Sequence, residues 1–339
     1  MRASQWLQTA ASYDMRENYH REAHQHLLAN IRLAGIWNNA PSPLYQSYLL
    51  YIIDIAFCSQ WELLQYDDWT DKQLAVWQIE WEKVDLLDSL LTEKLWEHAS
   101  TWKDLRAYRT EIAKTSELFW QLCPSTNRVP LNLFLEDPIA AAAGTVNTIA
   151  WPLWLSYHDE AKSLELLHGT VAIMRRLQAT SSLQSAQEDF SALIASYTNL
   201  PSYYLGTYHA TGKWIASFTK RKFEHQTLAS MAATAIALKR YTLRFGAAPD
   251  DLNQLPVDIR PQRMTDYMCG RPLRYTRVGE MQCKHWSVGT DFIDGNGDTT
   301  PTRTRYRHAV RDSADWVWPR AGTAEELRAH QISIGLKNP

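Results

Sequence analysis

An acidic stretch near the C-terminus holds the residues best suited to chemistry. Asp291, Asp294, Asn296 and Asp298 place four oxygen-bearing side chains within eight residues, and two glycines between them permit tight turns. Calcium prefers about six to eight hard oxygen ligands in a flexible geometry. The pattern therefore predicts a calcium site at these four residues.

Two points about this stretch stay open in the sequence. Asp315 completes the ligand set that we predict, although its neighbour Asp312 could take that place. An EF-hand is excluded because its spacing and its terminal glutamate are absent. Asp, Asn and Gly also favour ordinary surface turns, so a metal-free turn is the alternative.

His20 and His24 form a second candidate group. Residues four apart share a helix face, and this spacing suits zinc. The HExxH order is absent because Glu22 lies midway between the two histidines, and no third ligand can be named. We therefore expect a solvated helix face here.

The cysteines and the nucleophile motifs point away from catalysis. The four cysteines lack CxxC spacing, which argues against a zinc ribbon or a thioredoxin motif. Cys269 and Cys283 flank a predicted hairpin and could meet across it. The sequence contains no nucleophile elbow, Walker loop or GxGxxG pattern. We therefore predict no catalytic residue.

Composition narrows the classes of partner. The chain has 339 residues, enough for two domains, and its net charge of −2 argues against binding nucleic acid. The N-terminus lacks the apolar region of a signal peptide, and no window offers the roughly 20 apolar residues of a membrane span.

Most of the chain shows apolar residues at helical spacing. A helix is predicted to start near Pro43, and another at Thr70-Asp71, where either side chain can cap it. Gly246 can end a long helix because glycine adopts a left-handed conformation without steric cost. Further helices are expected at 159–179, 182–197 and about Phe223 to Phe245.

From residue 271 the spacing of apolar residues changes from the helical pattern to the alternation of short strands. Leu273 and Tyr275 suit one strand, and Trp286 and Val288 suit the next. We predict an α+β fold, in which a long helix covers one face of a small antiparallel sheet. The expected parts are a helical domain at 1–220, the long helix with the sheet and acidic loop at 221–320, and a tail at 321–339.

The C-terminal quarter resembles the C-terminal module of type II secretion major pseudopilins. The resemblance rests on three short stretches in a fixed order: Ala237-Leu238-Lys239-Arg240-Tyr241, Gly270-Arg271-Pro272-Leu273-Arg274-Tyr275 and Trp286-Ser287-Val288-Gly289-Thr290-Asp291. It implies a calcium loop in which Asp291 matches the family's loop aspartate. Asp266-Tyr267-Met268 stands where the family has Asp-Pro-Trp.

The resemblance also sets expectations about location. Pseudopilins have an N-terminal membrane helix that this sequence lacks, so we expect either an anchor outside this sequence or use of the module in a soluble protein. The helical part is similar to uncharacterised bacterial proteins around Thr70-Asp71-Lys72-Gln73-Leu74 and Leu86 to Leu90.

Two functions remain open at this point. The first is a non-catalytic, extracytoplasmic interaction or assembly protein, periplasmic or at the cell surface, with a protein partner or self-assembly and a calcium-stabilised module. The alternative is an enzyme or small-ligand binder with its site in a groove of the Trp-rich helical domain. Fifteen tryptophans raise this alternative, although helical spacing, as in Trp77 and Trp81, favours packing.

Overall fold

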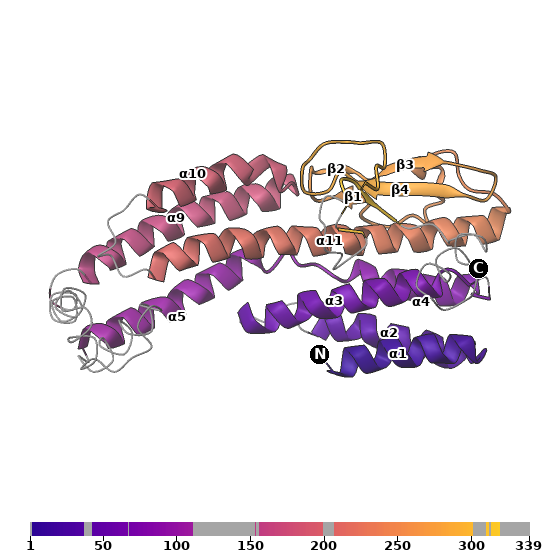
Figure 1. Cartoon of the computed structure of the whole chain (residues 1–339), viewed down its shortest axis with the longest axis horizontal. Helices are drawn as coiled ribbons and strands as arrows, with labels where there is room; N and C mark the ends of the chain where they lie inside the picture. Colours follow the sequence, from indigo (N-terminus) through magenta and orange to yellow (C-terminus); the bar gives the residue numbers. More distant parts are fainter. Residues whose placement is uncertain are drawn as a thin grey trace, which may run out of the picture. The chain divides into compact units, whose positions relative to one another are not determined.

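The described part of the chain is mostly helical, with small antiparallel sheets close to its C-terminal end (Figure 1). The computed structural model describes residues 2–36, 43–66, 68–110, 153, 156–198, 207–300, 310–311 and 313–318. The α+β class predicted from the sequence is confirmed in this broad sense. Cys123, Asp312 and the predicted tail at 321–339 lie outside the described residues.

The chain divides into two compact units. Unit 1 comprises Met1–Ile36, Tyr48–Val84 and His225–Pro339, and unit 2 comprises Trp37–Ser47 and Asp85–Glu224. Helix α11 (Thr207–Phe245) contributes to both units, since the change from unit 2 to unit 1 falls within it. The domain boundaries predicted from the sequence stay a prediction.

The helices begin at different residues from those expected in some places. The long helix α11 starts at Thr207, well before the expected Phe223, because the single glycine in that stretch, Gly212, is tolerated within a helix. The described helices besides α11 are α1 (Arg2–Arg16), α2 (His20–Ile36), α3 (Pro43–Leu63), α4 (Asp71–Glu82), α5 (Leu90–Thr110), α9 (Ser156–Thr180), α10 (Gln187–Thr198) and the short 3-10 helices η2 (Gln184–Ala186) and η3 (Leu252–Gln254).

The start of α4 follows the sequence prediction closely. Thr70 has an extended backbone, and its side chain accepts a hydrogen bond from the N–H of Gln73 at 3.3 Å. In return the Gln73 side chain accepts from the N–H of Thr70 at 3.0 Å. These reciprocal bonds form a capping box, which satisfies N–H groups that the helix itself leaves unpaired.

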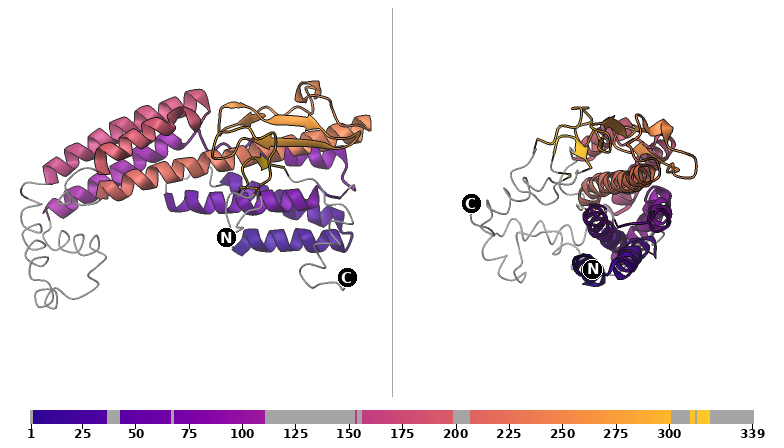
Figure 2. Two further views of the ribbon diagram at one scale, coloured as in Figure 1. Left: turned by 45° about the horizontal axis from the view of Figure 1, so that its top comes forward. Right: turned by 90° about the vertical axis from the view of Figure 1, so that its right-hand side faces the viewer.

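Helix α11 forms the centre of unit 1. In this unit the sheets lie on one side of α11 and helices α1 to α4 lie on the other, as the end-on view in Figure 2 shows. Small side chains between Leu228 and Leu238 are almost all buried, which lets the neighbouring elements approach closely. Arg240 ties α11 to α4 through a 2.7 Å ion pair with Asp71.

The sheets are small and antiparallel. Register pairs such as Tyr275 with His285 and Trp286 with Val317 define a three-stranded sheet of order β3-β4-β5. The third strand expected near Asp315 to Trp318 is confirmed, whereas the separate β1-β2 pair was not predicted. The strands are β1 (Thr265–Asp266), β2 (Arg271–Pro272), β3 (Arg274–Arg277), β4 (Cys283–Ser287) and β5 (Trp316–Val317).

The core of the C-terminal part forms where α11 meets the segment that follows it. Ala237 and Leu238 of α11 pack with Leu252, Leu255 and Ile259. Burial of such apolar side chains stabilises the fold by roughly 25 cal/mol per Å² of apolar surface removed from water. Among the described residues, no helix combines the length and the apolar character needed to cross a membrane.

Candidate functional site in the C-terminal acidic loop

Asp315 is fully buried and organises the acidic loop, which we define as residues 291–298. Its Oδ2 accepts hydrogen bonds from the N–H groups of Gly297 at 2.7 Å and Asp298 at 2.9 Å, and its Oδ1 accepts one from Gly295 at 3.3 Å. The carbonyl of Asp298 accepts the N–H of Asp315 at 3.0 Å. Because hydrogen bonds to a carboxylate are stronger than neutral ones, Asp315 sets the path of the loop.

Asp294 is held by three donors. Its Oδ1 accepts from the indole N–H of Trp286 and from the N–H of Asn296, both at 3.1 Å, and its Oδ2 accepts from Arg274 Nε at 3.0 Å. Partial burial acts to raise the pKa of Asp294, but these hydrogen bonds outweigh it, so the pKa lies below its ordinary value. Asp294 is therefore ionised, and groups of the protein itself donate the hydrogen bonds that it accepts.

Asp291 and Asp298 are exposed and have fewer partners. Asp291 Oδ1 accepts the N–H of Ile293 at 3.0 Å. Asp298 Oδ1 accepts the N–H and the hydroxyl of Thr300 at 2.9 and 2.6 Å, and these bonds lower the pKa of Asp298. The second oxygen of each carboxylate receives no hydrogen bond from the residues that the structure describes.

Asn296 contributes its backbone to the loop. Lys284 on β4 donates a hydrogen bond from its ammonium to the carbonyl of Asn296 at 2.9 Å and approaches the carbonyl of Gly297 at 3.4 Å. Asn296 and Gly297 have φ of 59° and 78°, in the left-handed region where asparagine and glycine are favoured. No sequence pattern marks Lys284, because it lies outside the acidic stretch.

The five predicted calcium ligands lie in one region, but they do not converge on a common point. In the described part of the chain, no group of three or more His, Cys, Asp or Glu side chains could hold a metal ion. The oxygens of Asp294 and Asp315 already accept hydrogen bonds from the protein, and Lys284 occupies the carbonyls of Asn296 and Gly297. These contacts fit a metal-free loop better than a calcium site, and calcium stays a prediction.

Asp266 is a second structural carboxylate that was not singled out as a site residue. It is fully buried, and it accepts hydrogen bonds from the hydroxyl of Ser287 at 2.7 Å and from the N–H groups of Met268 and Val288 at 3.1 and 3.0 Å. The sequence feature that could have pointed to Asp266 is its position shortly before Gly270. Asp266 therefore links β1 to the end of β4.

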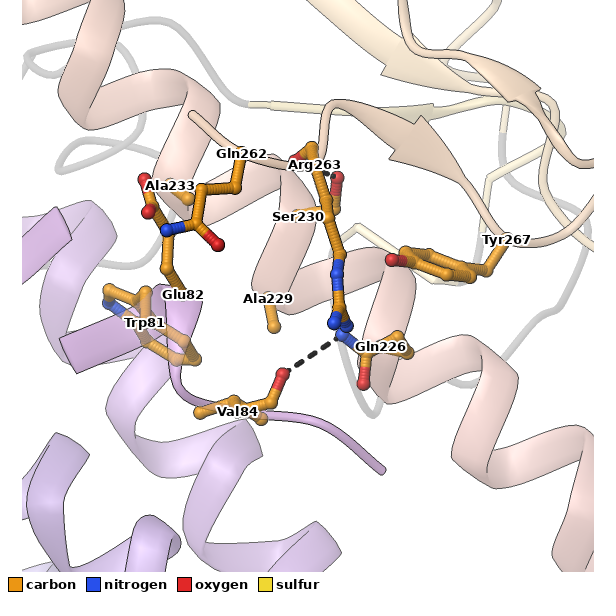
Figure 3. A pocket seen from close by; sticks show the side chains of 10 residues that line it. All are labelled: Trp81, Glu82, Val84, Gln226, Ala229, Ser230, Ala233, Gln262, Arg263 and Tyr267. Carbon is orange, nitrogen blue, oxygen red and sulfur yellow. Dashed lines mark hydrogen bonds between the residues drawn. The ribbon is translucent and has the colours of Figure 1, made fainter. Parts of the chain in front are cut away.

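A small cavity in unit 1 lies between the end of α4, α11 and the segment before β1 (Figure 3). Trp81, Glu82, Arg263 and Tyr267 are among its lining residues, and the Gln226 side chain there donates to the carbonyl of Val84 at 3.0 Å. About 20 Å³ is open to the centre of a water molecule, which suffices for about one water. The cavity is too small for an organic substrate.

Unit 2 contains a buried ion pair that no sequence motif predicts. The ammonium of Lys222 on α11 pairs with the carboxylate of Glu93 on α5, and it lies 3.3 Å from the hydroxyl of Ser89. Burial lowers the pKa of Lys222 to about 8, against the opposing effect of Glu93. Burial likewise raises the pKa of Glu93. The two residues are far apart in sequence, so no local pattern could have revealed the pair.

The histidines and tryptophans singled out in the sequence contact other side chains of the protein. His24 stacks on Trp77 with ring centroids 5.1 Å apart, and His20 lies 3.9 Å from Asp68. Trp69, Trp77 and Trp81 are buried, which confirms packing as their main role. Cys58, Cys269 and Cys283 are free thiols, so the disulfide considered between the last two is not formed.

Comparisons of the chain with protein-family models, with curated proteins and with solved structures gave no match. The resemblance to pseudopilins therefore stays an expectation drawn from the sequence.

Proposed function

We propose that this chain is a non-catalytic interaction or assembly protein with a pseudopilin-like C-terminal module. The observation that supports this most is the exposure of four large apolar side chains in the β3-β4 turn and near the end of α11. Val278 and Met281 lie between β3 and β4 with exposed fractions of 63% and 61%, and Leu243 and Phe245 near the end of α11 are 44% and 53% exposed. We call these four residues the apolar end.

The apolar end belongs to one connected part of unit 1. The N–H of Ala248 donates to the carbonyl of Glu280 at 2.8 Å, and Arg277 pairs with Asp250 at 2.6 Å. These contacts hold the β3-β4 hairpin against the segment that directly follows α11. Exposed apolar side chains on elements that are tied together favour a protein partner, because covering them removes apolar surface from water.

The polar groups of the module support a structural role as well. The carboxylates of Asp266, Asp294 and Asp315 each accept hydrogen bonds that hold neighbouring segments together. The small cavity beside Trp81 and Arg263 offers no room for an organic substrate. These observations favour an interaction protein over the enzyme or small-ligand binder considered from the sequence.

The compartment follows from the resemblance alone. A pseudopilin-like module implies a periplasmic or cell-surface location. The net charge of −2 is consistent with a protein partner and offers nothing to attract nucleic acid. Calcium at the acidic loop belongs to the same expectation and is tested separately below.

Self-association is the most direct test of the proposal. Sedimentation velocity of the full chain from about 1 to 100 µM covers the affinities expected of weak to moderate assembly. We expect a mass that rises with concentration above the 39.1 kDa of a single chain. The double substitution Val278→Ser and Met281→Ser should reduce this rise, because it removes apolar groups from the apolar end.

The matched control is Ile36→Ser, which changes an exposed apolar residue at the end of α2. It should leave the concentration dependence unchanged. A single-chain mass throughout the range, together with saturable binding of a small organic ligand, would instead favour the alternative that this chain is a small-ligand binder. Equal effects of the double variant and Ile36→Ser would remove the apolar end as the contact surface.

A further inference from the structure

The ammonium of Lys284 lies against the backbone of the acidic loop. It lies on β4, opposite Thr276 of β3, and its ammonium is 5.1 Å from the centre of the Trp286 ring. An ammonium over an indole face is attracted by the ring's negative π-surface. This contact, with the strand backbone, directs the side chain of Lys284 toward the loop.

The loop backbone turns its carbonyl groups toward this ammonium. Lys284 Nζ lies 2.9 Å from the carbonyl oxygen of Asn296 and 3.4 Å from that of Gly297. A Cβ atom at Gly297 would overlap Nζ of Lys284, and its φ of 78° also favours glycine. Gly297 is therefore required for the close approach of the ammonium.

The opposite side of the same peptide groups is held by a carboxylate. The N–H groups of Gly297 and Asp298 point to Asp315, which is fully buried. The loop thus lies between a carboxylate that accepts hydrogen bonds from its N–H groups and an ammonium that donates to its carbonyls. A calcium ion bound to Asp315 would compete with these N–H groups, and one bound to the carbonyls would compete with Lys284.

The adjoining strand supplies a second positive group. Arg274 on β3 donates from Nε to Asp294 at 3.0 Å, and the indole of Trp286 donates to the other oxygen of Asp294 at 3.1 Å. The carboxylates of Asp294 and Asp315 are thus matched by an arginine and by N–H donors of the protein itself.

We propose that the ammonium of Lys284 is a built-in cation that keeps the acidic loop in the conformation seen in the structure. It takes the role that the pseudopilin resemblance assigns to calcium. The C-terminal module then folds without a bound divalent metal. This inference is independent of the proposed function, because an interaction protein can have either kind of loop.

The test compares the full chain with Lys284→Met in EDTA and in calcium. About 10 mM calcium exceeds the dissociation constants of weak extracellular-type sites. Wild type should unfold at the same temperature in both solutions. Lys284→Met should unfold at a temperature lower by about 2–4 °C, because the loop carbonyls lose their ammonium.

Lys72→Met is the matched control, since Lys72 is an exposed lysine of α4 far from the acidic loop in sequence. It should leave the unfolding temperature unchanged. A rise of the wild-type unfolding temperature in calcium would overturn the proposal, and so would equal unfolding temperatures for wild type and Lys284→Met.

Hydrogen exchange of the wild-type chain provides a measurement that does not depend on a folded variant. The N–H groups of Gly297 and Asp298 should be protected to the same degree in EDTA and in calcium, because Asp315 and Lys284 hold the loop in both. Protection that appears only in calcium would show that the metal, and not Lys284, closes the loop.

Discussion

The carboxylate of Asp266 and the hydroxyl of Ser287 form a 2.7 Å hydrogen bond in the buried interior of unit 1. Asp266 lies on β1 and Ser287 ends β4, so this hydrogen bond is one of the contacts that join the two-stranded and the three-stranded sheet. Arg274 lies 3.7 Å from the same carboxylate and adds a favourable charge. The carboxylate of Asp266 therefore contributes to the stability of the C-terminal module through several contacts at once.

Replacing Asp266 should destabilise the protein strongly. Asp266→Ala leaves the hydroxyl of Ser287 and the N–H groups of Met268 and Val288 without their acceptor, so we expect the free energy of unfolding to fall by about 2–4 kcal/mol. Urea unfolding measures this change. Asp250→Ala removes an exposed carboxylate paired with Arg277 and should cost much less, because solvent screens an exposed ion pair. Equal losses would contradict the structural role of Asp266.

The buried pair of Lys222 and Glu93 should show strong coupling. Lys222→Met leaves Glu93 buried without its cation, and we expect the free energy of unfolding to fall by about 3–5 kcal/mol. Adding Glu93→Gln should recover most of this loss, because the neutral amide can still accept from the hydroxyl of Ser89. A double-mutant cycle by urea unfolding measures the coupling, and strictly additive losses would argue against the pair.

Acid should weaken the protein through His285. Burial lowers the pKa of His285 to about 4, against the weaker effect of its contact with the carbonyl of Met231 at 3.1 Å. The unfolded chain therefore takes up this proton at a higher pH than the folded protein. The contribution of His285 is fully present above pH 6.5 and is lost as the pH falls to about 4, by up to about 3 kcal/mol.

Thermal or urea unfolding between pH 4 and 7 measures this contribution. His285→Gln keeps a side-chain donor for the carbonyl of Met231 but does not titrate in this range. The stability of the variant should depend less on pH than that of wild type. Identical pH profiles for the two proteins would show that another group controls the acid response.

Two glycines with positive φ should respond differently to alanine. Gly246 has a φ of 74°, and nothing lies within 4 Å of an added Cβ. Gly246→Ala should therefore cost only the backbone strain, about 1 kcal/mol. Gly289 has a φ of 65°, and an added Cβ would overlap the backbone carbonyl of Ala314. Gly289→Ala should cost clearly more, as measured by urea unfolding, and equal costs would contradict this packing.

Local signals in the sequence determined much of the backbone. Thr70 forms the predicted cap of α4, Gly246 ends α11 in a left-handed conformation, and the change to a period of two residues after 271 marks β3 and β4. These features depend on neighbouring residues, because caps, left-handed glycines and strand alternation are set by local steric and hydrogen-bonding preferences. The acidic stretch could also be located as a loop from its Asp, Asn and Gly content.

The partners of the charged side chains were decided by the tertiary structure. Asp315 accepts hydrogen bonds from the loop N–H groups, Lys284 donates to the loop carbonyls, and Lys222 pairs with Glu93 across a separation of 129 residues. A run of aspartates in a sequence is equally consistent with a calcium shell and with carboxylates bonded to the protein itself. Which of these forms depends on the donors that packing brings near, and those donors come from segments that only the folded chain places together.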